Sequence, residues 1–389
     1  MHLNYSKELT KADFTIAVMS GNFVQRGDTS LVDKWTKTEM ALKAGIDLVI
    51  ELPLLYSISS AENFADGAIK ILNSLQVVDY LSFGSEIGNI SPLNDIASFL
   101  YKEPKEFSAL ITNQLRSGMS YPKAREIAMA LYFKDSKKYT DIMNNPNNIL
   151  GIEYLKSLKK HKSPIIPLTI KRDYSDYNSN TVKNGIASAT AIRTMIKNKK
   201  SIRKVVPAET YELLENKAKN RELIPDLSIF ERELIYTLRK MSLQEIANIP
   251  DVSEGLENKI KASANTCNNF ESLVAQIKSK RYTQSRIQRI LLYSLLGISK
   301  KDMNLSKKHI PYIRVLGFNK HGKRIISAIS SANPKLEIIV SPKKFMEHSN
   351  NTALRTMLSK DIFATNVYTL GYKNNPIANI DYTHKVIEI

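Results

Sequence analysis

Short apolar runs alternate with helical patterns through the first half of the chain, and this alternation constrains the fold more than any other feature of the sequence. Residues 61–75 place apolar side chains at three- and four-residue steps, and residues 33–44 have a helical composition, so both segments are predicted to be helices. Three runs indicate strands that are buried on both faces, 14–19, 47–52 and 77–83, and a fourth β-like run at 165–170 returns the chain to the sheet. Strands that alternate with helices in this way form βαβ units, so we expect an α/β fold built on a parallel sheet.

The chain is expected to divide into two regions near Ile202. Residues 92–159 look helical, and beyond Ile202 the sequence is mostly helical and dense in Lys and Arg. We therefore predict a sheet-containing domain over residues 1–201 and a mainly helical, basic region over residues 202–389. Two short β-like runs predict a small mixed element late in the chain, at 312–315 and 336–340.

The composition favours a basic protein of a reducing compartment. Lys and Arg total 56 against 38 Asp and Glu, a formal net charge of +18, which would attract nucleic acid, although a lysine-rich composition alone gives the same balance. Cys267 is the single cysteine, which excludes an internal disulfide and a Cys-rich zinc site, and we expect it to be buried. The sequence contains no run of about 18 apolar residues and no signal-peptide pattern, so a cytoplasmic location is predicted.

Ligands of a parallel sheet bind beyond the carboxyl ends of the strands, where loops and helix N-termini converge. The segments 20–27, 82–86 and 188–193 each follow or lead from a predicted strand in this way. In the last of them Ser188 and Thr190 would place hydroxyl and N–H groups at a helix N-terminus, with Arg193 one turn further on. These groups predict a phosphate site, and the alternative is a serine cap followed by a solvated arginine.

Six motifs occur in a characteristic order along the chain. They are GNFVQRG at 21–27, ELPLLYSISSAENFADGAI at 51–69, FGSE at 83–86, PNNILGIEYLK at 146–156, IKRDYSDY at 170–177 and ASATAIR at 187–193. Together they resemble the bacterial tRNA(Met) cytidine acetate ligase family over nearly the whole chain. The resemblance implies a nucleotidyltransferase-like (HUP/Rossmann-like) sheet and an ATP-dependent ligase that converts acetate to acetyl-adenylate. That intermediate would acetylate the wobble cytidine of elongator tRNA(Met) to N4-acetylcytidine, with Mg²⁺ accompanying the ATP.

The same resemblance assigns the ATP contacts. The residues that match the family's ATP-contacting positions or its phosphate motif are His2, Gly84, Asn147, Arg172, Asp173, Ser188, Thr190 and Arg193. Asn147 is expected to pair with adenine edges and Arg172 to bind the phosphate chain. The competing interpretations are a helix cap for Asn147, a surface charge for Arg172 and a disordered terminal side chain for His2.

The start of the chain is expected to depart from the family. The segment after Met1 resembles the family sequence only beyond its first strand and histidine loop, so that strand and loop are expected to be missing, and no catalytic residue or protein metal ligand is identifiable here. An active ligase with an upstream start and a tRNA-binding protein that has lost catalysis both remain open. A cofactor adenylyltransferase is disfavoured by the basic, helical C-terminal half.

Basic residues of the C-terminal half are the expected RNA contacts. Arg286 and Arg289 flank an apolar stripe on a predicted amphipathic helix, so they would present a basic face. The full predicted set is Lys278, Lys280, Arg281, Arg286, Arg289, Lys323 and Arg324. Phosphate binding is the functional interpretation of these residues, and a solvated charge run is the alternative.

Overall fold

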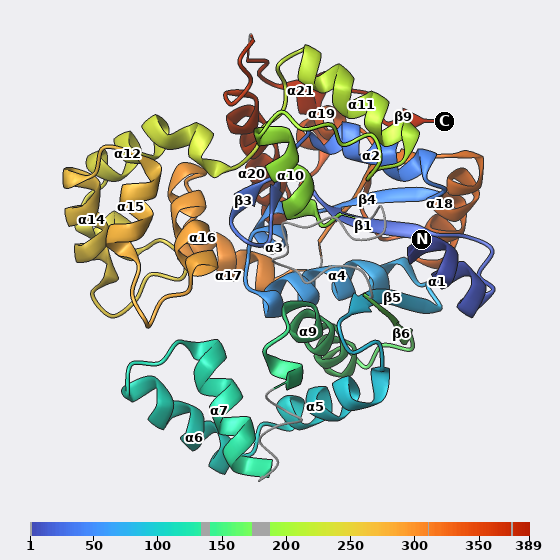
Figure 1. The fold of residues 1–389 in the computed structure, drawn as a ribbon. Helices are drawn as coiled ribbons and strands as arrows, with labels where there is room; N and C mark the ends of the chain where they lie inside the picture. The colour runs from blue at the N-terminus through green and yellow to red at the C-terminus, as the bar shows by residue number, and fades with distance from the viewer. Residues whose placement is uncertain (1, 134–140, 173–186, 310, 375) are drawn as a thin grey trace.

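A mixed, mostly parallel sheet forms the centre of the molecule (Figure 1). The computed structural model describes residues 2–133, 141–172, 187–309, 311–374 and 376–389. The strands of this sheet are β1 (Ile16–Ser20), β4 (Leu48–Leu52), β7 (Ile313–Phe318), β8 (Ile338–Ile339) and β9 (Ile387–Glu388). β1 pairs with β4 in parallel, and β7 pairs in parallel with β8 and β9, but β7 runs antiparallel to β4. The α/β class is therefore confirmed, and the all-parallel sheet is corrected to a mixed one.

A second parallel pair, β5 (Tyr80–Ser85) and β6 (Ile166–Lys171), lies beside the main sheet, and the short hairpin β2 (Phe23–Val24) and β3 (Asp28–Thr29) follows β1. All four predicted strand segments are therefore strands.

Every residue of β4 is buried, but every residue of β1 is partly exposed. In the part of the chain that is described, β1 pairs with β4 alone and β5 with β6 alone. A cavity of about 740 Å³ lies between β1 and β5.

Helices of the N-terminal half connect and cover these strands. The predicted helix at 33–44 is α2, whose first turn is capped by the Asp33 carboxylate, and α4 coincides with the predicted 61–75 helix and is capped by Ser60. The helices of this half are α1 (His2–Thr10), α2 (Lys34–Lys43), α3 (Leu54–Ser57), α4 (Ala61–Leu75), α5 (Ile90–Lys102), α6 (Lys105–Arg116), α7 (Tyr121–Phe133) and α9 (Pro146–Lys160).

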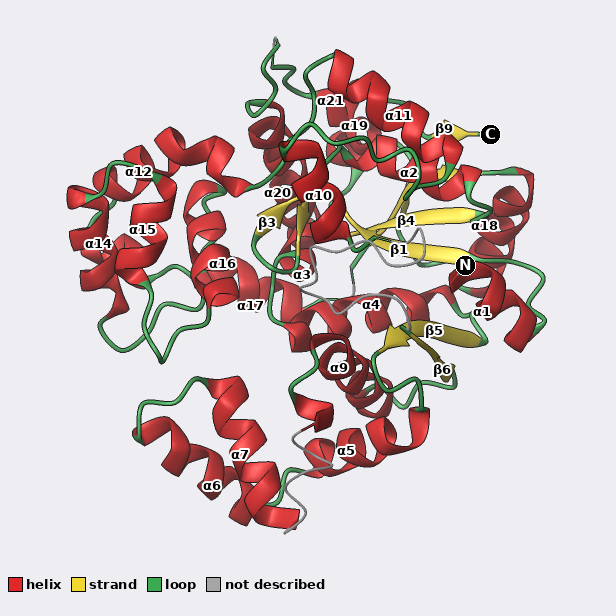
Figure 2. Cartoon of the chain, viewed as in Figure 1, coloured by secondary structure: helices red, strands yellow, loops and turns green. Residues whose placement is uncertain are grey.

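The C-terminal half is mostly helical, as predicted, and Figure 2 shows α12, α14, α15 and α16 gathered to one side of the sheet. Its elements are α10 (Ala189–Lys197), α11 (Ala208–Lys219), η1 (Leu227–Phe230), α12 (Glu231–Lys240), α13 (Leu243–Ala247), α14 (Leu256–Thr266), α15 (Phe270–Ile277), α16 (Gln284–Leu295), α17 (Lys300–Lys308), α18 (Lys320–Ala332), α19 (Pro342–His348), α20 (Thr352–Thr369) and α21 (Ile380–Thr383). Cys267 is buried, as expected. No helix in the described ranges is long and apolar enough to cross a membrane.

The late β-like runs do not form a separate element, so that expectation was wrong. β7 pairs with β4 along the main sheet, and β8 and β9 extend the sheet beyond it. Strand pairing between residues more than 250 positions apart follows from tertiary packing, which a local pattern does not encode. Residues from both sides of the predicted boundary near Ile202 therefore share one sheet.

Candidate active site

One acidic side chain joins the carboxyl end of β5 to the start of α9. The Glu86 carboxylate accepts hydrogen bonds from Asn147 N (3.1 Å), Asn147 Nδ2 (2.7 Å) and Asn148 N (2.8 Å). In return, Asn148 Oδ1 accepts from the backbone N–H groups of Glu86 (3.0 Å) and Ile87 (3.2 Å). The carboxylate thus satisfies free N–H groups at a helix N-terminus, where negative charge is stabilised. Asn147, expected to contact ATP, binds Glu86 through Nδ2, and its Oδ1 has no hydrogen bond with the residues that the structure describes.

Arg172 extends over Gly84 at the same end of the β5–β6 pair. Its backbone N–H donates to Ser85 O (3.0 Å), and a Cβ atom added at Gly84 would lie 3.2 Å from Arg172 Cγ. The Arg172 side chain is exposed, and its guanidinium has no hydrogen bond or ion pair with the residues that the structure describes. An uncommitted guanidinium beyond the ends of parallel strands is suited to bind a phosphate.

His2 reaches the middle of β5 from α1. Its Nε2 lies 3.1 Å from Ser82 Oγ, and Ser82 Oγ lies 2.7 Å from Ser6 Oγ. Burial, with a further contribution from the charge of Arg172, lowers the pKa of the His2 imidazole. The two predicted ATP contacts His2 and Arg172 are thus close enough to interact. Asp173, the remaining contact predicted in this motif, lies outside the described residues.

The N-terminus of α10 has the predicted cap, but its arginine has other partners. Ser188 accepts a hydrogen bond from Ala191 N (3.0 Å), and Thr190 is exposed on the first turn. The two Nη atoms of Arg193 donate to Pro225 O and Thr29 O, each at 2.6 Å, and Nη1 lies 3.8 Å from Asp28 Oδ2. Arg193 therefore ties α10 to the β2–β3 hairpin, and a phosphate would have to share or replace these bonds.

The GNFVQRG motif is largely structural. Asn22 Oδ1 accepts from the backbone N–H of Lys34 (2.8 Å), and Asn22 Nδ2 donates to Thr365 (3.1 Å), so one amide joins β1, α2 and α20. Gly27 has a positive φ of 74°, and a Cβ atom there would lie 2.3 Å from the backbone N of Arg289. This glycine is required because the hairpin turn packs directly on α16.

Sequence reasoning missed a group of buried charges at the carboxyl end of β4. We define the β4 charge cluster as Lys34, Glu51, Arg314 and Asp381. Lys34 Nζ lies 3.0 Å from Glu51 Oε2 and 2.8 Å from Asp381 Oδ1, and Arg314 Nη2 lies 2.5 Å from the same Asp381 oxygen. Burial alone would raise the pKa of Asp381, but Arg314 and Lys34 hold it at about 2. The four residues are spread from position 34 to 381, so a local sequence motif could not predict that they form a cluster.

Sequence reasoning also missed Lys37 of α2, whose ammonium lies at the end of β1. Its Nζ donates to Ser20 O (2.8 Å) and Gly21 O (2.6 Å). Burial lowers the pKa of this ammonium to about 8, against the opposing effect of Glu51. An ammonium has three donors, and the described residues use two of them, so the third is available to a ligand near the strand end.

Comparison with known proteins decides the family. The model of a family described as HIGH Nucleotidyl Transferase matches residues 1–381. The tRNA(Met) cytidine acetate ligase of Thermoanaerobacter sp. (strain X514) is 47% identical over 390 residues, which cover 100% of this chain and 95% of that protein. The ligase of Acetivibrio thermocellus is 41% identical, covering 99% and 95%. This chain belongs to the tRNA(Met) cytidine acetate ligase family.

Solved structures of the same family agree with the fold described above. Thermotoga maritima TmcAL in its apo form superposes with a TM-score of 0.95 at 31% identity, covering 100% of this chain and 95% of that one. The same protein bound with alpha-thio ATP superposes with a TM-score of 0.90. Because the matches span the whole of this chain, they give no support to the expected loss of a first strand and histidine loop relative to the tRNA(Met) cytidine acetate ligase family.

Several basic residues expected to contact RNA in this family member are engaged within the protein. Arg289 Nε and Nη2 lie 3.0 and 2.8 Å from Asp251 Oδ2, and Arg286 donates to Asp251 O (2.7 Å) and Ser253 Oγ (3.0 Å). The predicted basic face of α16 is therefore turned toward the 251–253 loop.

The other predicted RNA contacts divide into paired and unpaired side chains. Arg281 pairs with Glu254, Lys323 with Glu388, and Arg324 lies over Phe14, whereas Lys278 and Lys280 have exposed side chains without a hydrogen bond or ion pair in the described ranges.

Proposed function

We propose that this protein uses ATP to activate acetate and transfers the acetyl group to the wobble cytidine of elongator tRNA(Met). The observation that carries the proposal is the β5–β6 site, which we define as Gly84, Glu86, Asn147 and Arg172. It lies beyond the ends of two parallel strands and contains a guanidinium with no partner among the described residues. The matching of the whole chain to ligases of that name, one of them solved with an ATP analogue, supports the same substrates.

The reaction would proceed in two balanced steps. A carboxylate oxygen of acetate attacks the α-phosphorus of ATP, and pyrophosphate leaves with the bonding electrons to give acetyl-adenylate. The cytidine N4 then attacks the acyl carbon, AMP leaves, and N4 loses a proton to solvent. Both steps need charge stabilisation and positioning rather than a covalent nucleophile.

The side chains of the site would divide that work. Gly84 allows the flat adenine or ribose to approach the backbone, because a larger residue there would meet Arg172. Arg172 would bind the phosphate chain, and Asn147 Oδ1 would accept from the adenine amino group. The N-terminal turn of α10, on which Thr190 is exposed, would contribute N–H groups to the phosphates.

Magnesium would arrive with the nucleotide. No group of three or more His, Cys, Asp or Glu side chains among the described residues has the arrangement of a protein metal site. Glu86, the acidic residue of the β5–β6 site, already accepts three hydrogen bonds. Mg²⁺ is commonly held by substrate phosphates and waters with few protein ligands, which suits this site. A tRNA substrate and a single cysteine both support a cytoplasmic location for the proposed reaction.

The test is acetate transfer by the purified protein. Radiolabelled acetate, ATP and an elongator tRNA(Met) transcript are incubated with the protein, and label in RNA is measured beside acetate-dependent pyrophosphate release. We expect both signals, and loss of RNA labelling when the wobble cytidine is replaced by uridine. Tight tRNA binding without pyrophosphate release would overturn the proposal in favour of a tRNA-binding protein without catalysis.

A further inference from the structure

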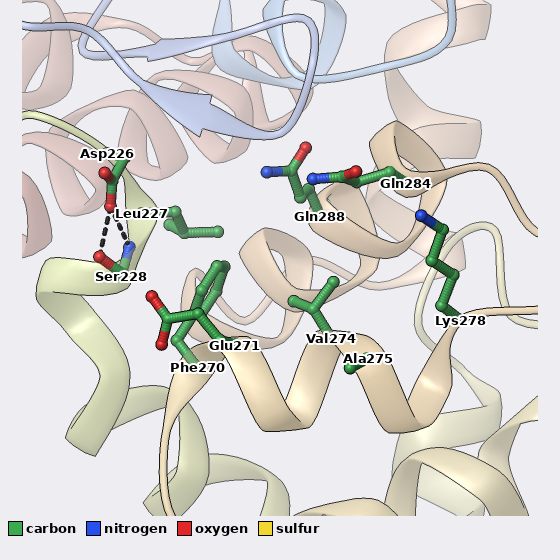
Figure 3. A pocket seen from close by; sticks show the side chains of 10 residues that line it. All are labelled: Asp226, Leu227, Ser228, Phe270, Glu271, Val274, Ala275, Lys278, Gln284 and Gln288. Atoms are coloured by element: carbon green, nitrogen blue, oxygen red, sulfur yellow. Dashed lines mark hydrogen bonds between the residues drawn. The ribbon is translucent and has the colours of Figure 1, made fainter. Parts of the chain in front are cut away.

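A pocket of about 410 Å³ opens between η1, α15 and α16, outside the β5–β6 site (Figure 3). Leu227, Phe270 and Val274 form its apolar wall, and Glu271, Gln284 and Gln288 contribute polar groups. In Figure 3 the two glutamine amides and the Phe270 ring point toward the same space. The volume lies in the range of pockets that hold a small flat molecule.

The polar groups of the pocket are available to a ligand. Gln284 and Gln288 are four residues apart on α16, so both amides project from one face of the helix. Within the described ranges, neither amide has a hydrogen bond, and neither does the carboxylate of Glu271 or the ammonium of Lys278. Each glutamine offers two donors and an acceptor, which is the complement needed to bind the edge of a nucleobase.

The pocket is firmly connected to the α/β part of the molecule. Leu227 N donates to Asp28 Oδ1 (2.8 Å), on the same β2–β3 hairpin that Arg193 of α10 binds through Thr29 O. The hairpin glycine, Gly27, packs against the α16 backbone where Gln288 is joined to Arg289. A ligand held in the pocket would therefore have a defined position relative to α10 and the site beside it.

We propose that this pocket receives one unpaired base of the tRNA substrate, an inference that rests on the proposed function. The base would lie against Phe270, since single-stranded RNA is recognised by stacking on aromatic rings and by hydrogen bonds to base edges. Gln284 and Gln288 would bind its edge, and Glu271 would accept from an exocyclic amino group. Lys278 on the rim and the net charge of +18 favour the adjoining phosphates. A base in this pocket is a positioning contact that helps to orient the RNA.

The experiment compares pocket variants with transcripts that each lack one base. Gln284→Ala, Gln288→Ala and the pocket-filling Ala275→Trp are assayed for KM and kcat with tRNA, and Gln244→Ala, an exposed glutamine on α13, is the matched control. Each transcript carries a single abasic position in the anticodon loop. We expect each pocket variant to raise the KM for tRNA about tenfold, with acetate-dependent pyrophosphate release and the melting temperature unchanged.

One abasic transcript should reproduce that rise with the unaltered protein, and combining it with Gln288→Ala should add nothing further, because both changes remove the same contact. The proposal is overturned if the KM of all three pocket variants stays within about twofold of the parent, as expected for a surface change outside the interface, or if no abasic position is coupled to Gln288. These failures leave acetylation by the parent intact. Absence of acetylation by the parent would instead remove the proposed function itself.

Discussion

The β4 charge cluster and the β5–β6 site both gather charges at the carboxyl ends of strands, but they use them in opposite ways. In the cluster, Lys34 and Arg314 are buried and each contacts a carboxylate within the protein. At the β5–β6 site, the Glu86 carboxylate accepts three hydrogen bonds from the N-terminus of α9. Arg172 is exposed there, and its guanidinium has no partner among the described residues. Charge at a strand end is therefore a poor indicator of a ligand site unless its pairing is known.

The difference has an energetic basis. A buried ion pair contributes little net stability, but removing one partner leaves a charge that has lost both water and its counterion. An exposed, unpaired arginine costs little to remove and has its full hydrogen-bonding capacity available for a ligand. The two regions should therefore respond to arginine substitution in different measurements, the first in stability and the second in binding.

The largest effect is expected for Arg314→Ala. This change leaves Asp381 and Glu51 without the guanidinium that lies 2.5 and 3.4 Å from them, and the free energy of unfolding should fall by about 3–5 kcal/mol. Urea denaturation followed by circular dichroism measures the change. Arg232→Ala, at an exposed position on α12, is the control and should change stability by less than about 0.5 kcal/mol. Equal effects of the two substitutions would show that the cluster is not an internally compensated unit.

Arg172→Ala should give the opposite pattern. We expect the Kd for ATP to rise by about 10- to 100-fold, which corresponds to loss of a charge-assisted contact of about 1.5–3 kcal/mol, while the free energy of unfolding and tRNA binding stay nearly unchanged. Calorimetric titration with a non-hydrolysable ATP analogue measures the affinity. Arg172→Lys should recover part of it, because lysine retains the charge but not the bidentate geometry. Parent-like affinity in the alanine variant would remove Arg172 from the ATP site.

Arg289 tests whether a predicted RNA contact belongs with the structural arginines. Because its side chain is buried against Asp251, Arg289→Ala should lower the free energy of unfolding by about 1–3 kcal/mol. Lys280→Ala, an exposed and unpaired neighbour in the predicted RNA set, should leave stability within about 0.5 kcal/mol. Chemical denaturation of both variants decides between these roles. A destabilised Lys280 variant with an unaffected Arg289 variant would reverse the assignment.

The fold could be predicted from the sequence where local pattern decides the structure. The four apolar runs and the 61–75 helix are present because buried strands and amphipathic helices have short periodicities. The antiparallel addition of β7 to β4 could not be predicted, since it joins segments that are distant in sequence. The same limit applies to the site. Motif order suggested Gly84, Asn147 and Arg172 as ATP contacts, an assignment that stays a prediction. The pairing of Arg289 with Asp251 and the exposure of Arg172 depend on tertiary neighbours.

A smaller effect should distinguish the charged cluster from the carboxyl group packed beside it. Asp361 accepts a hydrogen bond from Leu54 N (2.8 Å) and another from the hydroxyl of Tyr312. Burial, and then the nearby charge of Glu51, raise its pKa to about 7. Between about pH 4 and 7, Asp361 therefore carries a proton in the folded protein but has lost it in the unfolded chain. Because the native state binds more protons in this window, stability from Asp361 is complete below pH 4 and is lost as the pH rises toward 7.

Asp361→Asn imitates the protonated carboxyl at every pH, since the amide oxygen can still accept from Leu54 N and the amide nitrogen can face Tyr312. We expect the free energy of unfolding of the parent to fall relative to that of the variant by about 1 kcal/mol per pH unit between pH 5 and 6. Urea denaturation of both proteins at half-unit intervals measures this difference, in which the titrations of groups that do not interact with Asp361 cancel. A difference that stays constant with pH would mean that Asp361 is already ionised in the fold and belongs electrostatically to the β4 charge cluster.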